Sequence, residues 1–144
     1  MKIAVGADHA GFRIKDELKK RLAALGHSVE DAGTDSEQSV DYPDFAERVG
    51  RAIAEGRADR GVLVCGTGIG MSIAANKIAG VRAAVVTDPL TAEMSRRHND
   101  ANVFCAGARV LAPEKIAELL DLWLKTPFEG GRHERRVEKI RRLE

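Results

Sequence analysis

The amino-acid sequence predicts an α/β fold: one doubly wound, Rossmann-like three-layer domain built on a five-stranded parallel sheet. Short apolar runs of strand length alternate with longer segments in which apolar residues recur at helical spacing. The strand-length runs are rich in valine, which argues against an all-helical fold. The 144 residues are enough to bury a core, and no linker or repeat divides them, so we expect one domain over residues 1–144.

The first half of the chain contains three predicted strands and two predicted helices. The strands are short apolar runs, and they span residues 3–6, 27–31 and 61–65. Helical periodicity predicts a helix over 12–25, which Gly26 ends as a C-cap. A polar turn segment over 33–39 precedes a second helix over 42–55, because the apolar residues of that segment lie four apart on one face.

The second half repeats this alternation. Strands are predicted over 81–87 and 103–106, and helices over 71–78, 89–98, 113–125 and 131–143. Prolines at positions 89 and 113 mark the starts of two of these helices. In a doubly wound fold the chemistry lies at the carboxyl ends of the strands, so the loops that follow the strands are the first place to look for a site.

Composition excludes several classes of protein. The chain has 23 Lys+Arg and 22 Asp+Glu residues and a net charge of +1, which argues against a protein that mainly binds nucleic acid. No apolar segment is long enough to span a membrane, and the short run over residues 3–5 breaks too early for a signal peptide. Cys65 and Cys105 are too few for a disulfide framework, so we expect a reduced, cytoplasmic protein.

A glycine-rich loop over 66–70 follows the clearest strand directly. Glycines at alternate positions allow the backbone N–H groups to turn inward, and a helix begins next, so the loop is typical of an anion-binding nest. The loop lacks the dinucleotide-binding pattern because Met71 stands where glycine is required, and no phosphate-binding Gly-Lys-Ser/Thr follows. We interpret these amides as an oxyanion hole for a reaction intermediate.

The two cysteines receive different interpretations. Cys65 ends the strand beside the nest, where a helix N-terminus favours a thiolate, so it is a candidate general base. The alternative is a buried structural cysteine, which is the commoner role. Cys105 lies inside a predicted strand and is expected to be structural.

Three further groups of polar residues are candidates with open alternatives. Asp8 and His9 follow the first strand and are suited to bind sugar hydroxyls or phosphate, although Asp8 is equally suited to cap the next helix. His98 is suited to proton transfer or to binding the last carbonyls of its helix. Because it precedes the last strand, His98 lies at the amino edge of the sheet, and a catalytic role requires it to reach the site of a neighbouring subunit.

The basic C-terminal helix offers a phosphate site. Arg132 and Arg136 are four residues apart and share a helix face, which is suitable for clamping one phosphate. Arg109, just after the last strand, is a third candidate. Two other interpretations of this helix stay open: a solvated charged helix, or a weak nucleic-acid-binding patch. The interleaved glutamates weaken the nucleic-acid interpretation.

Taken together, these motifs resemble the family of ribose-5-phosphate isomerase B and galactose-6-phosphate isomerase. The matching stretches run in order through nearly the whole chain, which makes the set highly specific. They are Gly6-Ala7-Asp8-His9-Ala10-Gly11-Phe12, Asp41-Tyr42-Pro43, Cys65-Gly66-Thr67-Gly68-Ile69-Gly70, Ser72-Ile73-Ala74-Ala75-Asn76-Lys77, Arg97-His98-Asn99-Asp100-Ala101-Asn102 and Phe128-Glu129-Gly130-Gly131-Arg132-His133.

The resemblance implies reversible conversion of ribose 5-phosphate to ribulose 5-phosphate without metal or cofactor. It assigns Cys65 as the base that moves a proton between C1 and C2, and His98 as the residue that opens the furanose ring. For the enediolate oxygens, the resemblance implies Thr67 and the amides of Gly66, Gly68, Ile69 and Gly70. For the sugar it implies Asp8, His9, Tyr42 and Asn99. For the phosphate it implies Arg109, Arg132 and Arg136. It also implies a homodimer or a dimer of dimers with shared sites, in which helix 131–143 contributes to the phosphate site or the dimer.

Several alternatives stay open from sequence. Allose 6-phosphate and galactose 6-phosphate are rival substrates, because pocket length decides between five and six carbons. The presence of both Cys65 and His98 in one chain favours a homo-oligomer over a two-subunit assembly. A phosphosugar- or nucleotide-binding regulatory module is possible on the same fold, but the two candidate catalytic residues argue against it.

Overall fold

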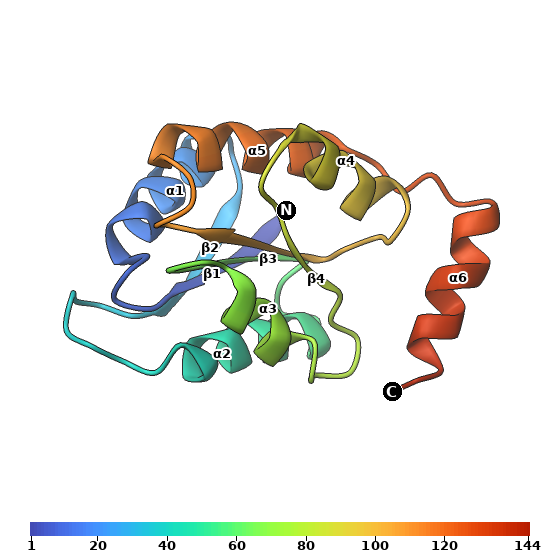
Figure 1. The fold of residues 1–144 in the computed structure, drawn as a ribbon, viewed down its shortest axis with the longest axis horizontal. Helices are drawn as coiled ribbons and strands as arrows, with labels where there is room; N and C mark the ends of the chain where they lie inside the picture. The colour runs from blue at the N-terminus through green and yellow to red at the C-terminus, as the bar shows by residue number, and fades with distance from the viewer.

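Five parallel strands form one sheet in the order β2-β1-β3-β5-β4, and helices cover both of its faces (Figure 1). The computed structural model describes all residues, 1–144. The strands are β1 (Lys2–Ala7), β2 (Ser28–Gly33), β3 (Arg60–Cys65), β4 (Ala83–Val85) and β5 (Val103–Gly107). The predicted doubly wound α/β fold with a five-stranded parallel sheet is therefore confirmed.

The helices divide between the two faces according to the alternation of side chains along the strands. The helices are α1 (Phe12–Ala24), α2 (Tyr42–Ala54), α3 (Ile69–Ala75), α4 (Pro89–Arg97), α5 (Pro113–Lys125) and α6 (Arg132–Arg141). One core cluster joins α1, α4 and α5 to one face, and it contains the fully buried Trp123. The other joins α2 and α3 to the opposite face, and it contains Cys65 and Cys105. No helix is long and apolar enough to cross a membrane.

Helix α6 stands apart from these layers, at the right of Figure 1. None of its residues belongs to either core cluster. Its two buried side chains are His133 and Val137, while Ile140 and Leu143 near its end are exposed. The expected helix over 131–143 is thus present as α6, and its packing on its own chain is slight.

The central strands bring three loops to one edge of the sheet. Parallel register pairs Ala7 of β1 with Val64 of β3, and Cys65 of β3 with Gly107 of β5. The loops that leave β1, β3 and β5 therefore start side by side at the carboxyl edge. Because β3 and β5 also start in register, at Gly61 and Val103, the segment that enters β5 lies at the opposite, amino edge.

Two element boundaries differ from the sequence expectation. Helix α3 was expected over 71–78, but it begins at Ile69 because Gly68, with φ +80°, turns the chain directly into the helix. It ends before Asn76, whose side chain exchanges hydrogen bonds of 2.8 and 2.9 Å with the backbone of Ala83. Strand β4 was expected over 81–87, but it spans only Ala83–Val85, and as an edge strand it pairs on one side only, with β5.

Gly11 allows α1 to approach the sheet closely. A Cβ atom at this position would lie 2.3 Å from the carbonyl oxygen of Val64, which is backbone and has no room to move. The backbone N–H of Asp8 donates to this same oxygen at 3.3 Å. The start of α1 and the end of β3 are consequently held together without an intervening side chain.

We predict that Gly11→Ala lowers the free energy of unfolding by about 1–3 kcal/mol, the usual cost of overpacking a buried position. Denaturant unfolding monitored by circular dichroism measures the change. Ala23→Ser, on the exposed end of the same helix, is the control and should shift stability by only about 0.5 kcal/mol. Equal denaturant midpoints for Gly11→Ala and the wild type would show that the backbone near Val64 shifts at little energetic cost to make room for the Cβ atom.

Candidate active site

Hydrogen bonds connect the loops at the carboxyl edge into one surface. The amide of Ala108 donates to the carbonyl of Cys65 at 2.8 Å, and the amide of Arg109 donates to that of Gly66 at 3.0 Å. The loop after β3 is thereby tied to the loop after β5. Gly107 permits this approach, because a Cβ there would lie 2.7 Å from the backbone of Thr67.

Cys65 sits at the centre of this surface. It is the last residue of β3, and its side chain is buried among the residues of the α2–α3 face. Its Sγ accepts a hydrogen bond from the amide of Gly68 at 3.2 Å. The left-handed conformation of Gly68 directs its N–H back toward the sulfur, so the glycine loop and the thiol form one unit.

The glycine loop leaves several of its N–H groups unused by the chain. The amides of Gly66, Thr67 and Gly70 donate to no acceptor in the protein, whereas that of Ile69 donates to Thr67 Oγ1 at 3.3 Å. Unpaired amides beside a thiol are suited to bind negatively charged oxygens. The geometry agrees with the anion nest expected from the sequence.

Tyr42 faces this loop from the first turn of α2. Its ring packs on Gly70 so closely that a Cβ on Gly70 would lie 2.6 Å from the ring. Gly70 was expected to belong to the loop, but it lies in the first turn of α3. Its lack of a side chain leaves the space that the ring of Tyr42 occupies.

Asp8 and His9 lie on the neighbouring loop, after β1. The nearly buried carboxylate of Asp8 accepts hydrogen bonds through Oδ1 from the amides of Ala10 and Gly11, at 2.9 and 3.2 Å. It therefore shapes the turn ahead of α1, while the helix N-cap itself is Gly11, without a side-chain cap. His9 Nδ1 accepts from the amide of Val40 at 3.2 Å, which fixes the imidazole against the segment that leads into α2.

Arg109 completes the carboxyl-edge group. Its guanidinium packs over the glycine loop, since a Cβ on Gly66 would lie 3.3 Å from Arg109 Nη1. The side chain is exposed and forms no ion pair within the chain. This edge thus brings together ten of the predicted site residues, counting Ile69 through its backbone, and Arg109 adds a positive charge beside the thiol and the free amides. They are Asp8, His9, Tyr42, Cys65, Gly66, Thr67, Gly68, Gly70 and Arg109, with the backbone of Ile69 alongside.

The remaining predicted site residues lie at the opposite edge. His98 is the C-cap of α4, and the exposed Asn99 follows it. Arg132 and Arg136 are exposed on α6, which meets the end of α4 through His133. The structure therefore does not bring His98 or the α6 arginines to Cys65 within one chain, as expected from the place of His98 before the last strand.

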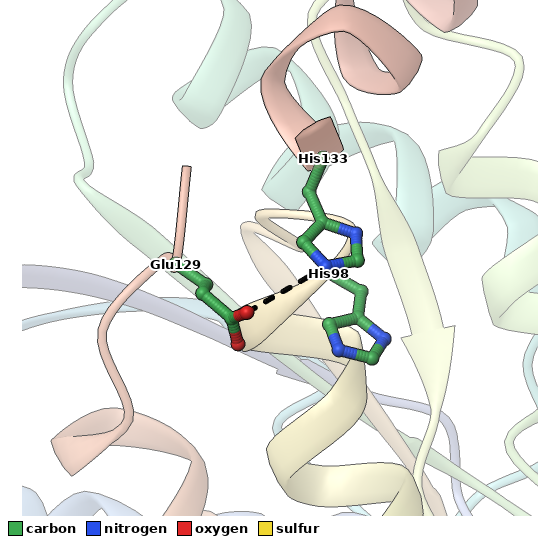
Figure 2. Close-up of side chains that lie close together, drawn as sticks. All are labelled: His98, Glu129 and His133. Carbon is green, nitrogen blue, oxygen red and sulfur yellow. Dashed lines mark ion pairs between the residues drawn. The ribbon is translucent and has the colours of Figure 1, made fainter. Parts of the chain in front are cut away.

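Two residues at this edge were missed by sequence reasoning. His133 stacks on His98 with ring centroids 4.0 Å apart, and Glu129 Oε1 lies 3.8 Å from His133 Nε2. Potential ligand atoms of these three residues lie within 4.8 Å of one another, so they form the one cluster close enough to be considered for a metal ion (Figure 2). Both missed residues fall within a matching stretch of the family pattern, which was the available signal.

Burial shifts the pKa values of one cysteine and one histidine, Cys105 and His133. Burial raises the pKa of the Cys105 thiol far above its usual range, and the nearby Cys65 acts in the same direction. Cys105 is thus neutral, in agreement with the structural role expected for it. Burial also lowers the pKa of the His133 imidazole, and the charges of His98 and Arg132 add to this effect.

Comparisons with known proteins agree with this geometry. The sequence model of the Ribose/Galactose Isomerase family matches residues 3–140. The chain is 49% identical over 143 residues to Ribose-5-phosphate isomerase B of Escherichia coli K12, covering 99% of this chain and 96% of the relative. It is 43% identical to D-erythrulose-4-phosphate isomerase of Pectobacterium atrosepticum, covering 97% and 93%. The structure of Clostridium thermocellum Ribose-5-Phosphate Isomerase B superposes with a TM-score of 0.98 at 49% identity, covering 99% of this chain and 97% of that one.

We predict that iodoacetamide modifies Cys65 but not Cys105 in the folded protein near pH 8. Alkylation requires a thiolate, and the raised pKa and complete burial of Cys105 deny it one. Mass spectrometry should find a single modified thiol in the wild type and in Cys105→Ala, and none in Cys65→Ser. Labelling of Cys105 in folded Cys65→Ser would contradict the assignment.

Proposed function

The chain belongs to the ribose/galactose isomerase family, and from this premise we propose that it interconverts ribose 5-phosphate and ribulose 5-phosphate through an enediolate. The observation that carries the proposal is the unit formed by Cys65 and the glycine loop: a thiol at the end of a strand, hydrogen-bonded to Gly68 and surrounded by amides with no partner. Aldose–ketose isomerisation needs one base and several fixed donors, and this unit supplies both.

The proton transfer follows from this arrangement. Cys65, as thiolate, takes the proton from C2 of the open-chain aldose, the C2–H electron pair forms a C1=C2 double bond, and negative charge moves to O1. The amides of Gly66, Thr67 and Gly70, with the hydroxyl of Thr67, donate to O1 and O2. The Cys65 thiol then returns the proton to C1, and the proton on O2 moves to O1 as the C2 carbonyl forms. The substrate loses and regains one proton, so no electrons enter or leave.

Ring opening belongs to His98 in this proposal. His98 donates a proton to the ring oxygen O4 as the C1–O4 bond breaks, and a water molecule takes the proton that the C1 hydroxyl loses, which produces the aldehyde that Cys65 requires. His98 then regains a proton from solvent. Because Cys65 and His98 lie at opposite edges of the sheet, one chain cannot present both to one sugar. We therefore propose a homodimer, or a dimer of dimers, in which each site combines the carboxyl edge of one chain with the amino edge of another.

A hollow beside α6 supports this assembly. A cavity of about 610 Å³ lies between the C-terminal part of α6 and the segment that connects α3 to β4. It is lined mainly by apolar side chains, among them Val81 and Ile140. The exposed Ile69 and Ile73 on α3 are apolar side chains of the right kind to fill it from a second copy. A partner seated there brings its own glycine loop, which begins α3, toward α6.

The phosphate in this proposal binds to arginines of both edges. Arg132 and Arg136 of one chain and Arg109 of the other supply charge without reacting, and Asn99 binds a sugar oxygen. Asp8, His9 and Tyr42 contact the sugar from the carboxyl edge. Both cysteines are free thiols, as a reducing compartment maintains them, and we expect the enzyme to act in the cytoplasm.

Relatives define the substrates to compare. The family description includes galactose, and one relative bears the name of a four-carbon sugar phosphate isomerase. Ribose 5-phosphate is the first choice because two relatives that are 49% identical to this chain bear its name. Allose 6-phosphate, galactose 6-phosphate and erythrulose 4-phosphate are the comparison substrates, and activity on one of these alone would keep the mechanism and change the substrate.

We predict that chelator-treated enzyme converts ribose 5-phosphate to ribulose 5-phosphate, and that Cys65→Ala lowers turnover by about 10²–10⁴-fold, the contribution of a positioned base. Colorimetric detection of the ketose measures both rates. Cys105→Ala is the matched control and should retain nearly full activity. Near-normal turnover by Cys65→Ala would remove this thiol from the mechanism, and absence of turnover on all four sugars would favour a binding module.

We predict that two inactive variants restore activity when they assemble together. Cys65→Ala and His98→Asn each lack one half of every shared site, but a mixed dimer contains one site with both residues intact. Random assembly after co-expression should therefore recover about one quarter of wild-type activity. Co-expression of Cys65→Ala with Cys65→Ser is the control and should recover none. Failure of the first pair to recover would argue against sites shared between chains.

A further inference from the structure

His98 and His133 form a stacked pair at the amino edge (Figure 2). The rings are 4.0 Å apart between centroids and only 9° from parallel. His98 is half-buried at the end of α4, whereas His133 is 3% exposed in the first turn of α6. An imidazole at a helix end otherwise samples several rotamers, so a buried ring against one of its faces restricts it.

The chain anchors His133 independently of His98. The amide of Glu129 donates to the carbonyl of Arg97 at 3.0 Å, and the side chains of the same two residues form an ion pair at 3.3 Å. The His133 amide then donates to the carbonyl of Gly130 at 3.1 Å. The segment that leads into α6 is therefore fixed to the end of α4, and it delivers His133 onto His98.

Burial, with the charges of His98 and Arg132, favours a neutral His133 against the opposing carboxylate of Glu129, and the arrangement of the rings disfavours a metal ion. Arg132 Nε lies 3.5 Å from His133 Nε2 in donor geometry, which requires a free lone pair on that nitrogen. Parallel stacked rings point their lone pairs in parallel rather than toward one ion, so the donor set with Glu129 is poorly shaped for coordination. The positive charges of Arg97 and Arg132 beside it oppose a dication.

We propose that His133 is a positioning residue for the sugar ring-opening step, acting through its stacked contact with His98. The inference rests on the proposed function, and it concerns only the half of the reaction that His98 carries. Because His133 stays neutral, only His98 of the stacked pair exchanges protons with the sugar. The stacking holds the His98 imidazole in one orientation at the end of α4 before the substrate binds.

The chemistry of the two sugars separates this step from the rest of the reaction. Ribose 5-phosphate closes through O4 into a furanose, so the enzyme must open it before Cys65 can act. Ribulose 5-phosphate has its O5 in the phosphate ester and cannot form a furanose, so it enters as the open ketose. Exchange of its C1 proton with solvent needs the base and the oxyanion donors but no ring opening.

The experiment compares His133→Leu with His133→Phe. We expect His133→Leu to lower turnover of ribose 5-phosphate by about 10- to 100-fold, the effect of a misplaced catalytic group. Deuterium exchange at C1 of ribulose 5-phosphate, followed by NMR, should stay within about twofold of wild type. His133→Phe keeps a flat ring against His98 and should restore most of the turnover. Lys139→Ala, exposed on the same helix, controls for disturbance of α6, and thermal unfolding confirms that each variant folds.

Three results would overturn the proposal. Equal losses of turnover and exchange in His133→Leu would indicate a merely structural role. Equal losses in the Phe and Leu variants would show that ring nitrogens, and not stacking, matter. Unchanged turnover in folded His133→Leu would show that His98 needs no such support. Failure of the proposed function itself appears differently, as wild-type enzyme with neither turnover nor exchange.

Discussion

The length of the central strands is the constraint on which the organisation of the site depends. Strands β3 and β5 run in register from Gly61 and Val103 to Cys65 and Gly107, about 13 Å at the usual rise per residue. The loops that leave the parallel strands lie at one edge of the sheet, and the segments that enter the strands lie at the other edge. Cys65 and His98 therefore lie at opposite edges of one chain, which is why the proposed mechanism calls for a second copy.

Close backbone contacts make the carboxyl edge a rigid surface. Gly11 lies against Val64, Gly107 lies against Thr67, and Gly70 leaves space for the ring of Tyr42. Each contact would be blocked by a single Cβ atom. The donors around Cys65 are therefore fixed before substrate arrives, which is how oxyanion stabilisation avoids a reorganisation cost.

The sequence was sufficient for the order of elements, the sheet type and the division of the site between two edges. The α3 boundary was missed because the left-handed turn at Gly68 starts the helix at once, and β4 was overestimated because this edge strand pairs only with β5, over Ala83–Val85. His133 and Glu129 escaped notice for a different reason. Their role depends on how the segment after α5 folds back onto α4, and neither periodicity nor spacing in the chain encodes a contact between residues 98 and 133.

Helix α6 carries the arginines proposed to bind the phosphate, yet it contributes nothing to either core cluster of its own chain. Its apolar residues Ile140 and Leu143 remain exposed until another molecule covers them. In the proposed assembly, catalytic competence belongs to the oligomer, and mass action governs it. Specific activity per chain then depends on enzyme concentration: dilution below the dissociation constant of the oligomer abolishes activity without unfolding the core of each chain, and a higher concentration restores it.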